Sequence, residues 1–524
     1  MSFLSKYKFL IILLILLVFS FSTFNLVEVG LMEARNFQTA NEIIEDDNWL
    51  LPTLNGEPRY QKPPLPTWIT ALSVLISNSK SIIFYRLPAI IFLFVIGLTS
   101  YFFSIKIKFN KQESIINGLI TISSFYIIAI IFEAPWDIFA HGFMFLGIYY
   151  LLENKLSNRQ KIIAGIFIGL SIMSKGPISI YALLTPFLLS YFLVYRKLNY
   201  KNIIQVLLIS IIFGSSWYIY VYTQDYQTLM EISSQETENW SNYNVKPLYY
   251  YWDFFINSGI WAIPAIASLI LPFTKNSITI SKSHLLTCYW VIFSLILLSL
   301  IPEKKTRYLM PVLIPLALNT GFYINYIIKY SSDKINSVSW PMYLNFIIVS
   351  ISGIIIPSIS IYNSGFEFFS ILSILITSYF IYNFYKKEFE KAVYLKIILF
   401  LCIINIILPE TYANTNEDFT DIKELKNEIN ELKLYSDYQV TADLIWNVNK
   451  RIKKLDVTII DDSIFGLISN ANLDNKNNKI LDNDLIITKK IKLNFNTTSD
   501  EEDNRYRDRL KTNLYILSKI RAKL

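Results

Sequence analysis

Long apolar runs recur along most of this chain, and they constrain its fold more than any other feature. Runs of about spanning length centre near residues 9–24, 83–104, 114–132, 138–152, 162–173, 178–195, 203–222, 255–273, 285–301, 310–328, 341–361, 367–385 and 393–408. A helix needs about 20 mostly apolar residues to cross a bilayer. Only 17% of the residues are charged, whereas soluble domains carry about a quarter. The sequence predicts a polytopic α-helical membrane protein with about thirteen transmembrane helices, and it excludes a single soluble fold and a disordered chain.

The positions of Lys and Arg predict the orientation of these helices. Lys6 and Lys8 precede the first run, and no small-residue cleavage site follows it. We therefore expect a retained first helix rather than a cleaved signal peptide. With a cytoplasmic N-terminus, nearly every short inner loop carries two or three cations, as the positive-inside rule requires. An odd number of helices then places the C-terminus outside.

One apolar segment, from Leu65 to Ser77, is too short to span comfortably. It follows Pro63-Pro64 and contains Trp68. Counting it as a span would invert every later loop and break the charge rule. We expect an interfacial helix that closes the first outer loop, with Trp68 at the level of the headgroups.

The composition changes near Pro409. Residues 410–524 are rich in Asn, Asp, Lys and Glu and contain no run of spanning length. Residues 421–434 show helical spacing of apolar residues, while residues 438–442, 457–460 and 485–488 are typical of short strands. We expect a transmembrane domain over residues 1–408, whose first outer loop (28–82) holds interfacial helices, and a small extracytoplasmic α/β domain over residues 409–524.

Cysteine and histidine usage excludes two kinds of site. Cys288 and Cys402 lie far apart inside apolar runs, and the chain has only two histidines. The sequence therefore predicts neither a disulfide framework nor a His-rich metal centre. Nothing in it predicts a nucleic-acid partner.

Ionisable residues near membrane segments are functional candidates because they are costly to place there. In the predicted topology they gather on the outer side, where carboxylates and cations suit acid–base chemistry on an anionic lipid headgroup. They are Glu28, Glu33, Arg35, Glu42, Glu57, Arg59, Lys62, Glu133, Asp137, Lys175, Glu231, Glu236, Glu238, Lys246, Glu303, Lys304, Lys305 and Arg307.

Each candidate also has a structural interpretation. Glu33 and Arg35 could form an ordinary interfacial ion pair, and Asp137 could merely orient His141, four residues later on one helix face. Lys175 could be a snorkelling lysine. The cluster from Lys304 to Arg307 could be a solvated loop.

The combination of motifs is more specific than any one of them. Glu33-Ala34-Arg35-Asn36 and the stretch from Asn48 to Leu65, which contains Arg59-Tyr60-Gln61-Lys62-Pro63-Pro64, resemble the first outer loop of the GT-C glycosyltransferases of family 39. That group includes the lipid A aminoarabinose transferase and the protein O-mannosyltransferases. The resemblance covers roughly residues 1–330. It continues through Arg86-Leu87-Pro88, Trp136-Asp137, Ser174-Lys175-Gly176-Pro177 and Lys305-Thr306-Arg307-Tyr308-Leu309-Met310-Pro311.

The resemblance implies transfer of a sugar from a polyprenyl-phosphate donor to an acceptor at the outer face of the bacterial inner membrane. It implies Glu33 and Asp137 as the catalytic carboxylates. A pair of adjacent acids is common at the first position, but here Met32 precedes Glu33. The donor phosphate is expected to meet Arg35, Arg59, Tyr60, Lys62, Lys175, Lys304, Lys305, Arg307 and Tyr308.

A departure from the family concerns a metal. The aminoarabinose branch usually has Glu before the lysine that corresponds to Lys62, and this Glu, with a histidine of the fourth outer loop, can bind a divalent ion. Here Gln61 occupies that position, and no histidine lies between His141 and His284. Since a neutral amide is a poor divalent ligand, we expect no metal cofactor.

Three functions remain open. The first is a glycosyltransferase acting on lipid A or another envelope glycolipid, and the second is a protein O-glycosyltransferase of the same fold. The third is a lipid-sugar transporter, a class that favours inverted repeats and ionisable residues at the midplane of the bilayer. The sequence shows no repeat, and its charges lie at the outer surface, which favours an enzyme.

Overall fold

The computed structural model describes residues 25–133, 135–152, 156–274, 281–330, 338–456, 464–471, 473 and 485–519. Contacts divide the chain into two compact units. The membrane unit comprises residues 1–27 and 60–409, and the α/β unit comprises residues 28–59 and 410–524. The predicted first helix, residues 9–24, lies outside the described residues, as does the predicted strand 457–460.

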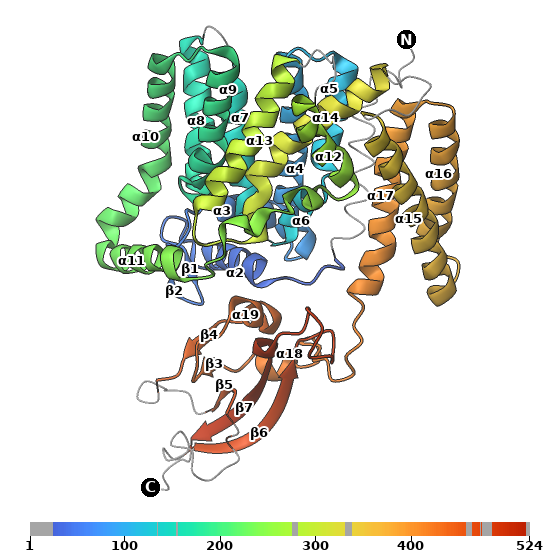
Figure 1. The fold of residues 1–524 in the computed structure, drawn as a ribbon. Helices are drawn as coiled ribbons and strands as arrows, with labels where there is room; N and C mark the ends of the chain where they lie inside the picture. Colours follow the sequence, from blue (N-terminus) through green and yellow to red (C-terminus); the bar gives the residue numbers. More distant parts are fainter. Residues whose placement is uncertain are drawn as a thin grey trace, which may run out of the picture. The chain divides into compact units, whose positions relative to one another are not determined.

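The membrane unit is helical throughout its described part (Figure 1). Each of the twelve apolar runs predicted from residue 83 onward coincides with one or more helices. The polytopic α-helical fold is thereby confirmed. The elements are α3 (Leu65–Ser77), α4 (Ile82–Lys106), α5 (Lys111–Ile122), α6 (Phe125–Glu133), α7 (Pro135–Leu151), α8 (Asn158–Lys175), η1 (Ile180–Leu184), α9 (Thr185–Tyr195), α10 (Tyr200–Gln224), α11 (Tyr226–Asn242), η2 (Leu248–Tyr251), η3 (Phe254–Trp261), α12 (Ala262–Ile270), η4 (Leu271–Phe273), α13 (Lys282–Leu300), η5 (Thr306–Leu309), α14 (Met310–Tyr330), α15 (Trp340–Ser364), α16 (Phe368–Tyr385) and α17 (Phe389–Thr411).

The number of spans is smaller than expected when length and hydropathy are applied strictly. Within the described residues, eight helices are long and apolar enough to cross a membrane. A ninth arises if α5 and α6, bent by 43°, form one broken span. Three other predicted runs coincide with α7, α8 and the helix Ile180–Tyr195, which are not among the eight. The count of thirteen therefore stays a prediction.

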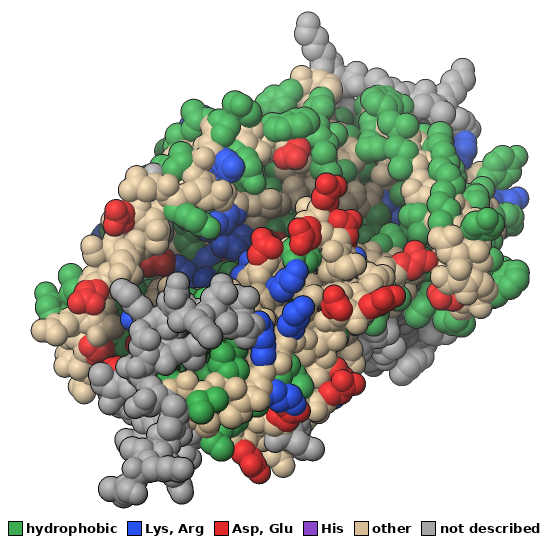
Figure 2. Space-filling view, turned by 90° about the horizontal axis from the view of Figure 1, so that it is seen from below, with side chains coloured by type: hydrophobic (Ala, Val, Ile, Leu, Met, Phe, Trp, Pro, Cys, Tyr) green, Lys and Arg blue, Asp and Glu red, His purple; other side chains and the backbone are tan. Residues whose placement is uncertain are grey.

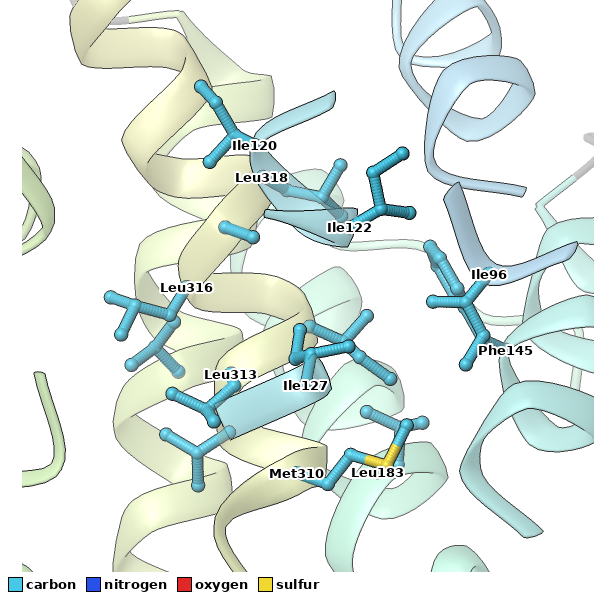
Figure 3. Close-up of a cluster of buried hydrophobic side chains, with 14 of the residues drawn as sticks. Ile96, Ile120, Ile122, Ile127, Phe145, Leu183, Met310, Leu313, Leu316 and Leu318 are labelled. Carbon is cyan, nitrogen blue, oxygen red and sulfur yellow. The ribbon is translucent and has the colours of Figure 1, made fainter. Parts of the chain in front are cut away.

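Helix α14 forms the centre of the membrane unit. Its spanning window is 83% buried, the highest value among the candidate spans. Met310, Leu313, Leu316 and Leu318 project from it into a buried apolar cluster (Figure 3). That cluster is completed by side chains from α4, α5, α6, α7 and η1, namely Ile96, Ile120, Ile122, Ile127, Phe145 and Leu183.

The outermost helices keep apolar side chains on their surface. The spanning windows of α10, α15 and α16 are only 22%, 28% and 33% buried, and their exposed residues include many Ile, Leu, Phe and Tyr. Hydrophobic side chains of this kind are visible at the periphery of Figure 2. Such faces are typical of helices in contact with lipid, where no water is present to penalise them.

The α/β unit contains a five-stranded sheet in the order β4-β3-β5-β7-β6. Pairs β3–β4 and β3–β5 are parallel, whereas β5–β7 and β6–β7 are antiparallel. Two apolar clusters lie on this sheet, one around Leu434, Leu444 and Leu514 and the other around Phe465 and Tyr515. The elements are β3 (Leu434–Ser436), α18 (Lys426–Ile429), α19 (Ala442–Val448), β4 (Ile452–Lys454), β5 (Ile464–Ser469), β6 (Leu485–Asn494), η6 (Asp508–Leu510) and β7 (Lys511–Lys519).

Two local predictions for this unit are wrong. The helix expected over residues 421–434 shrinks to the single turn α18, although Ile429 and Leu432 still face the core. No strand forms over residues 438–442. Residues 438–441 form the loop before α19, and the nearby strand β3 ends at Ser436. The predicted strand at residues 485–488 is confirmed as the start of β6.

Residues 28–59 pack with the C-terminal segment inside the α/β unit. Helix α2 (Leu31–Asp46) contacts α19, and the Phe37 and Trp446 rings lie 5.4 Å apart. Hairpin strands β1 (Thr53–Leu54) and β2 (Glu57–Pro58) flank Asn55, whose side chain hydrogen-bonds the backbone N–H and carbonyl of Ile452. Residues 28–59 thus group with residues 410–524, whereas the sequence led us to expect them in the transmembrane domain.

Candidate active site

The ends of α7 and α8 place a carboxylate and an ammonium together in the membrane unit. Proline at the first helical position favours the start of α7, and Asp137 lies in its first turn. Lys175 is the last residue of α8. Both charges suit the dipoles of their helix ends. Lys175 Nζ donates to Asp137 Oδ1, with the side chains only 12% and 2% exposed.

The aromatic ring of Tyr308 lies against the Lys175 end of this pair. Lys175 Nζ lies 4.8 Å from the centroid of that ring, a cation–π distance. Lys305 Nζ lies 5.9 Å from the same centroid and also pairs with Glu303. Tyr308 belongs to the 3-10 turn η5, so the loop before α14 brings a ring and a second cation toward Asp137 and Lys175.

Two further predicted residues lie in the same electrostatic environment. Lys62 and Arg307 are within electrostatic range of the Lys175 ammonium. The structure therefore brings six of the predicted site residues to one region of the membrane unit: Asp137, Lys175, Tyr308, Lys305, Lys62 and Arg307. A region with several cations around the buried carboxylates of Asp137 and Glu303 is suited to a phosphate group and to proton transfer beside it.

Lys304 is placed differently. Its side chain is 2% exposed, and Nζ donates to the carbonyl oxygens of Ile301 (2.7 Å), Lys246 (2.9 Å) and Pro302 (3.5 Å). Burial lowers the pKa of this lysine. Its backbone N–H also donates to the Asn244 carbonyl. Lys304 thus joins two loop segments, and its ammonium is directed at backbone rather than at the Asp137 region.

Tyr60 and Lys62 each contact a carboxylate near helix α11. Asp225 caps the start of this helix, and Glu236 lies on it. The Tyr60 hydroxyl donates to Asp225 Oδ2 at 3.1 Å, and burial together with this carboxylate raises the pKa of Tyr60 to about 12. Lys62 Nζ lies 2.9 Å from Glu236 Oε2, with the two side chains 28% and 34% exposed. The lysine expected to hold the donor phosphate is therefore paired with a carboxylate of this chain.

The other three predicted residues lie in the α/β unit. Glu33 is fully buried in the first turn of α2. Arg35, two residues after Glu33 on that helix, is half-buried, and its Nη1 lies 3.6 Å from Met32 Sδ. The backbone N–H of Arg59 donates to the Pro52 carbonyl beside the β1–β2 hairpin. Their predicted roles stay predictions.

The residues present do not fit the metal site of the aminoarabinose branch. Gln61 stands where that site needs a carboxylate, and no histidine lies between His141 and His284. Among the residues that the structure describes, no three His, Cys, Asp or Glu side chains cluster as metal ligands do. We therefore derive no step through a metal, and metal independence stays a prediction.

Sequence reasoning missed several residues of this region. It did not single out Asp225, the partner of Tyr60, or Ser179, whose hydroxyl lies 3.0 Å from His141 Nδ1. The sequence did offer one signal for Ser179, because it lies two residues after the Lys175-Gly176-Pro177 motif. Asp225 lies just after the apolar run 203–222, but its pairing with Tyr60 had no signal, since the two are 165 residues apart.

The sequence matches one protein-family model and is similar to two known proteins. Residues 61–220 match the model of the family described as dolichyl-phosphate-mannose-protein mannosyltransferase. Two uncharacterized proteins of Aquifex aeolicus (strain VF5) are similar to the chain. One is 25% identical over 330 residues, which cover 61% of this chain and 73% of the relative. The other is 23% identical over 346 residues, which cover 63% and 66%.

Solved structures extend the likeness to nearly the whole chain. The crystal structure of ArnT from Cupriavidus metallidurans in the apo state is 14% identical, with a TM-score of 0.69 and 98% of both chains covered. The same protein bound to undecaprenyl phosphate is 13% identical, with a TM-score of 0.68 and the same coverage. The chain therefore has the GT-C fold and resembles the aminoarabinose transferase and O-mannosyltransferase group. The resemblance derived from the motifs is confirmed.

Proposed function

We propose that the protein is an integral-membrane glycosyltransferase that moves a sugar from a polyprenyl-phosphate donor to lipid A or another envelope glycolipid. In this proposal the N-terminus is cytoplasmic, and both the acceptor and the α/β unit lie at the outer face of a bacterial inner membrane. The observation that carries it is the buried Asp137–Lys175 pair beneath Tyr308, within range of Lys62 and Arg307.

The comparisons support the class of donor. The family model that matches residues 61–220 is named for a dolichyl-phosphate sugar, and the ArnT structure of similar fold holds undecaprenyl phosphate. Dolichyl phosphate and undecaprenyl phosphate, the lipids in these two names, each carry a single phosphate on a polyprenyl chain. The exposed apolar faces of the outer helices suit a donor whose tail stays in the bilayer.

The proposed reaction is a displacement at the anomeric carbon of the sugar. The acceptor hydroxyl forms the new C–O bond and gives its proton to a carboxylate. The bond between the anomeric carbon and the phosphate oxygen breaks, and its electron pair leaves with the polyprenyl phosphate. Lys175, Lys62 and Arg307 stabilise the charge that develops on this phosphate. When the phosphate attracts Lys175, the Asp137 carboxylate becomes available to the acceptor hydroxyl.

A second acceptor class follows from the family match. The matched family transfers mannose to protein, so a polypeptide hydroxyl is the alternative acceptor for the same donor chemistry. The donor half of the reaction and the roles of Asp137 and Lys175 are the same in both cases.

The test uses the purified full-length chain in detergent with a radiolabelled undecaprenyl-phosphate sugar. Lipid A, mixed envelope glycolipids and a Ser/Thr-rich peptide are offered as separate acceptors, with Asp137→Asn as the control whose transfer is strongly slowed but still measurable. We expect label in a glycolipid product, and label in the peptide would select the second acceptor class. Label retained on the donor with every acceptor, for several donor sugars, would contradict the proposed function.

A further inference from the structure

A second link joins α7 to the segment that follows α8, next to the Asp137–Lys175 pair. His141 lies one turn after Asp137 on α7, and Ser179 follows Lys175 by four residues. Ser179 Oγ lies 3.0 Å from His141 Nδ1. His141 Nε2 lies 3.7 Å from Asp137 Oδ1, inside ion-pair range although longer than a hydrogen bond. His141 is 2% exposed and Ser179 is fully buried.

The backbone after Lys175 sets the position of Ser179. Gly176 caps α8 with φ of 78°, a left-handed conformation that favours glycine, and its N–H donates to the Ile172 carbonyl. The N–H of Ile180 then donates to the Pro177 carbonyl. Ser179 immediately precedes η1, a π-helical segment, and such segments occur frequently at functional sites.

These neighbours determine where the imidazole carries its proton. A neutral imidazole has one N–H donor and one acceptor nitrogen. We assign the donor role to the Ser179 hydroxyl, so that Nδ1 accepts and the proton resides on Nε2, facing the Asp137 carboxylate. The opposite tautomer would direct a lone pair of Nε2 at a carboxylate oxygen.

We propose that His141, held in this tautomer by Ser179, is a positioning residue for Asp137. The inference rests on the proposed function. In the resting site, Lys175 neutralises Asp137. When a donor phosphate attracts Lys175, the buried carboxylate keeps the Nε2–H of His141 as a partner and keeps its orientation toward the acceptor. His141 therefore acts after the donor has bound, and its loss lowers turnover rather than donor affinity.

The other histidine of the chain provides a matched control. His284 is also buried, but its Nε2 lies 3.0 Å from the Ser268 carbonyl and its ring stacks on Phe322 at 5.3 Å. It belongs to α13 and has a backbone partner where His141 has a carboxylate. His284→Gln therefore tests what the loss of a satisfied core histidine does by itself.

The kinetic test compares His141→Phe, His141→Gln and Ser179→Ala in the full-length chain, alone and combined with Asp137→Asn. His141→Phe should lower turnover by about 10- to 100-fold, the scale of a misplaced catalytic group, while KM for the donor changes less than about threefold. His141→Gln keeps an acceptor and a donor, so it should restore most of the rate. In the Asp137→Asn background, His141→Phe should have no further effect.

A spectroscopic test does not depend on turnover. Labelling the chain with ¹⁵N-histidine gives signals from two rings only, and His284→Gln assigns them. We expect His141 in the Nε2–H tautomer, with a signal that shifts in Asp137→Asn and a mixture of tautomers in Ser179→Ala.

The two tests separate failure of the inference from failure of the proposed function. An Nδ1–H tautomer, additive effects of His141→Phe and Asp137→Asn, or a His141→Gln variant as slow as His141→Phe would each overturn the positioning role. A wild-type chain that transfers no sugar but shows the expected tautomer and its dependence on Asp137 would contradict the proposed function and leave the arrangement of His141 supported.

Discussion

Lys175 and Lys304 are two lysines of the membrane unit that the sequence treats alike, since both stand next to apolar runs in motifs of the resemblance. Lys175 pairs with the Asp137 carboxylate and lies against the Tyr308 ring. Lys304 donates to three backbone carbonyls. From this difference we expect the partner of a buried cation, rather than its motif, to indicate whether it serves chemistry or loop structure. A carboxylate and a ring can exchange the cation with an arriving phosphate, whereas three carbonyls would be left without a donor.

The first prediction extends the comparison from cations to carboxylates. Glu33 is fully buried in α2, and we expect Glu33→Gln to lower turnover by about 10²–10⁴-fold if it is a general acid–base group. Donor affinity should change little, because size and hydrogen bonding are retained. Single-turnover transfer from a labelled donor measures the rate. Glu57→Gln, at an exposed position of the same loop, is the control. Wild-type turnover in Glu33→Gln would leave Asp137 as the only carboxylate of the predicted pair.

The second prediction sharpens the contrast between cations that meet phosphate and cations that do not. Lys62→Ala and Arg307→Ala should each weaken donor binding by about 1.5–3 kcal/mol, the value of a hydrogen bond to a charged group. That corresponds to roughly 10- to 150-fold in Kd. Binding of undecaprenyl phosphate to the purified variants measures it. Lys246 is exposed, and it contacts Lys304 through its backbone carbonyl rather than through its side chain. The Lys246→Ala variant should therefore bind undecaprenyl phosphate as the wild type does. Equal losses in Lys246→Ala would argue for a general charge effect.

The third prediction concerns the carboxylate that pairs with Lys62. Because Glu236 and a donor phosphate compete for the same ammonium, Glu236→Gln should tighten binding of undecaprenyl phosphate. The pair is partly exposed and worth about 0.2–1 kcal/mol, so the gain is about 1.4- to 5-fold and should shrink as salt increases. Glu238→Gln, two residues further on α11 and exposed, is the matched control. Weaker binding in Glu236→Gln would show that Glu236 supports the site instead of competing for it.

The fourth prediction is an absence of effect. Since Gln61 stands where a carboxylate ligand is needed, the cations of the site should suffice without a metal. Transfer activity should therefore be unchanged after treatment with EDTA and dialysis. Activity that is lost on chelation and restored by zinc or magnesium would contradict this and would require a different set of ligands.

The sequence predicted the membrane unit well because length and hydropathy decide it. Helix α3 has the predicted bounds, Leu65–Ser77, since a proline pair precedes it and Asn78, in a left-handed conformation with φ of 49°, ends it. The α/β unit was less predictable. Its elements are short, and tertiary contacts decide whether a segment such as residues 421–434 forms one helical turn or four.

The candidate site was also predictable only in part. Motifs identified Asp137, Lys175, Lys62, Arg307 and Tyr308, which the fold brings to one region. Partners could not be predicted, because pairing depends on contacts between distant segments. The first loop meets Ile452 through Asn55, 397 residues away, and no pattern in the sequence indicates that contact.

The contrast between Lys175 and Lys304 gives the most direct test of the account. Lys175→Met and Lys304→Met each remove one buried ammonium of the membrane unit, and sugar transfer and thermal unfolding are measured for both. Lys175→Met should lower the turnover of the folded fraction by about 10²–10³-fold, the effect of losing one group that stabilises developing charge, and it should also destabilise the protein, because it leaves the buried Asp137 carboxylate without its cation. Lys304→Met should destabilise the protein by about 1–3 kcal/mol, because it leaves buried carbonyls without a donor, while the folded fraction keeps its turnover. Full activity in Lys175→Met would contradict the assignment of the Asp137–Lys175 pair as the reaction centre.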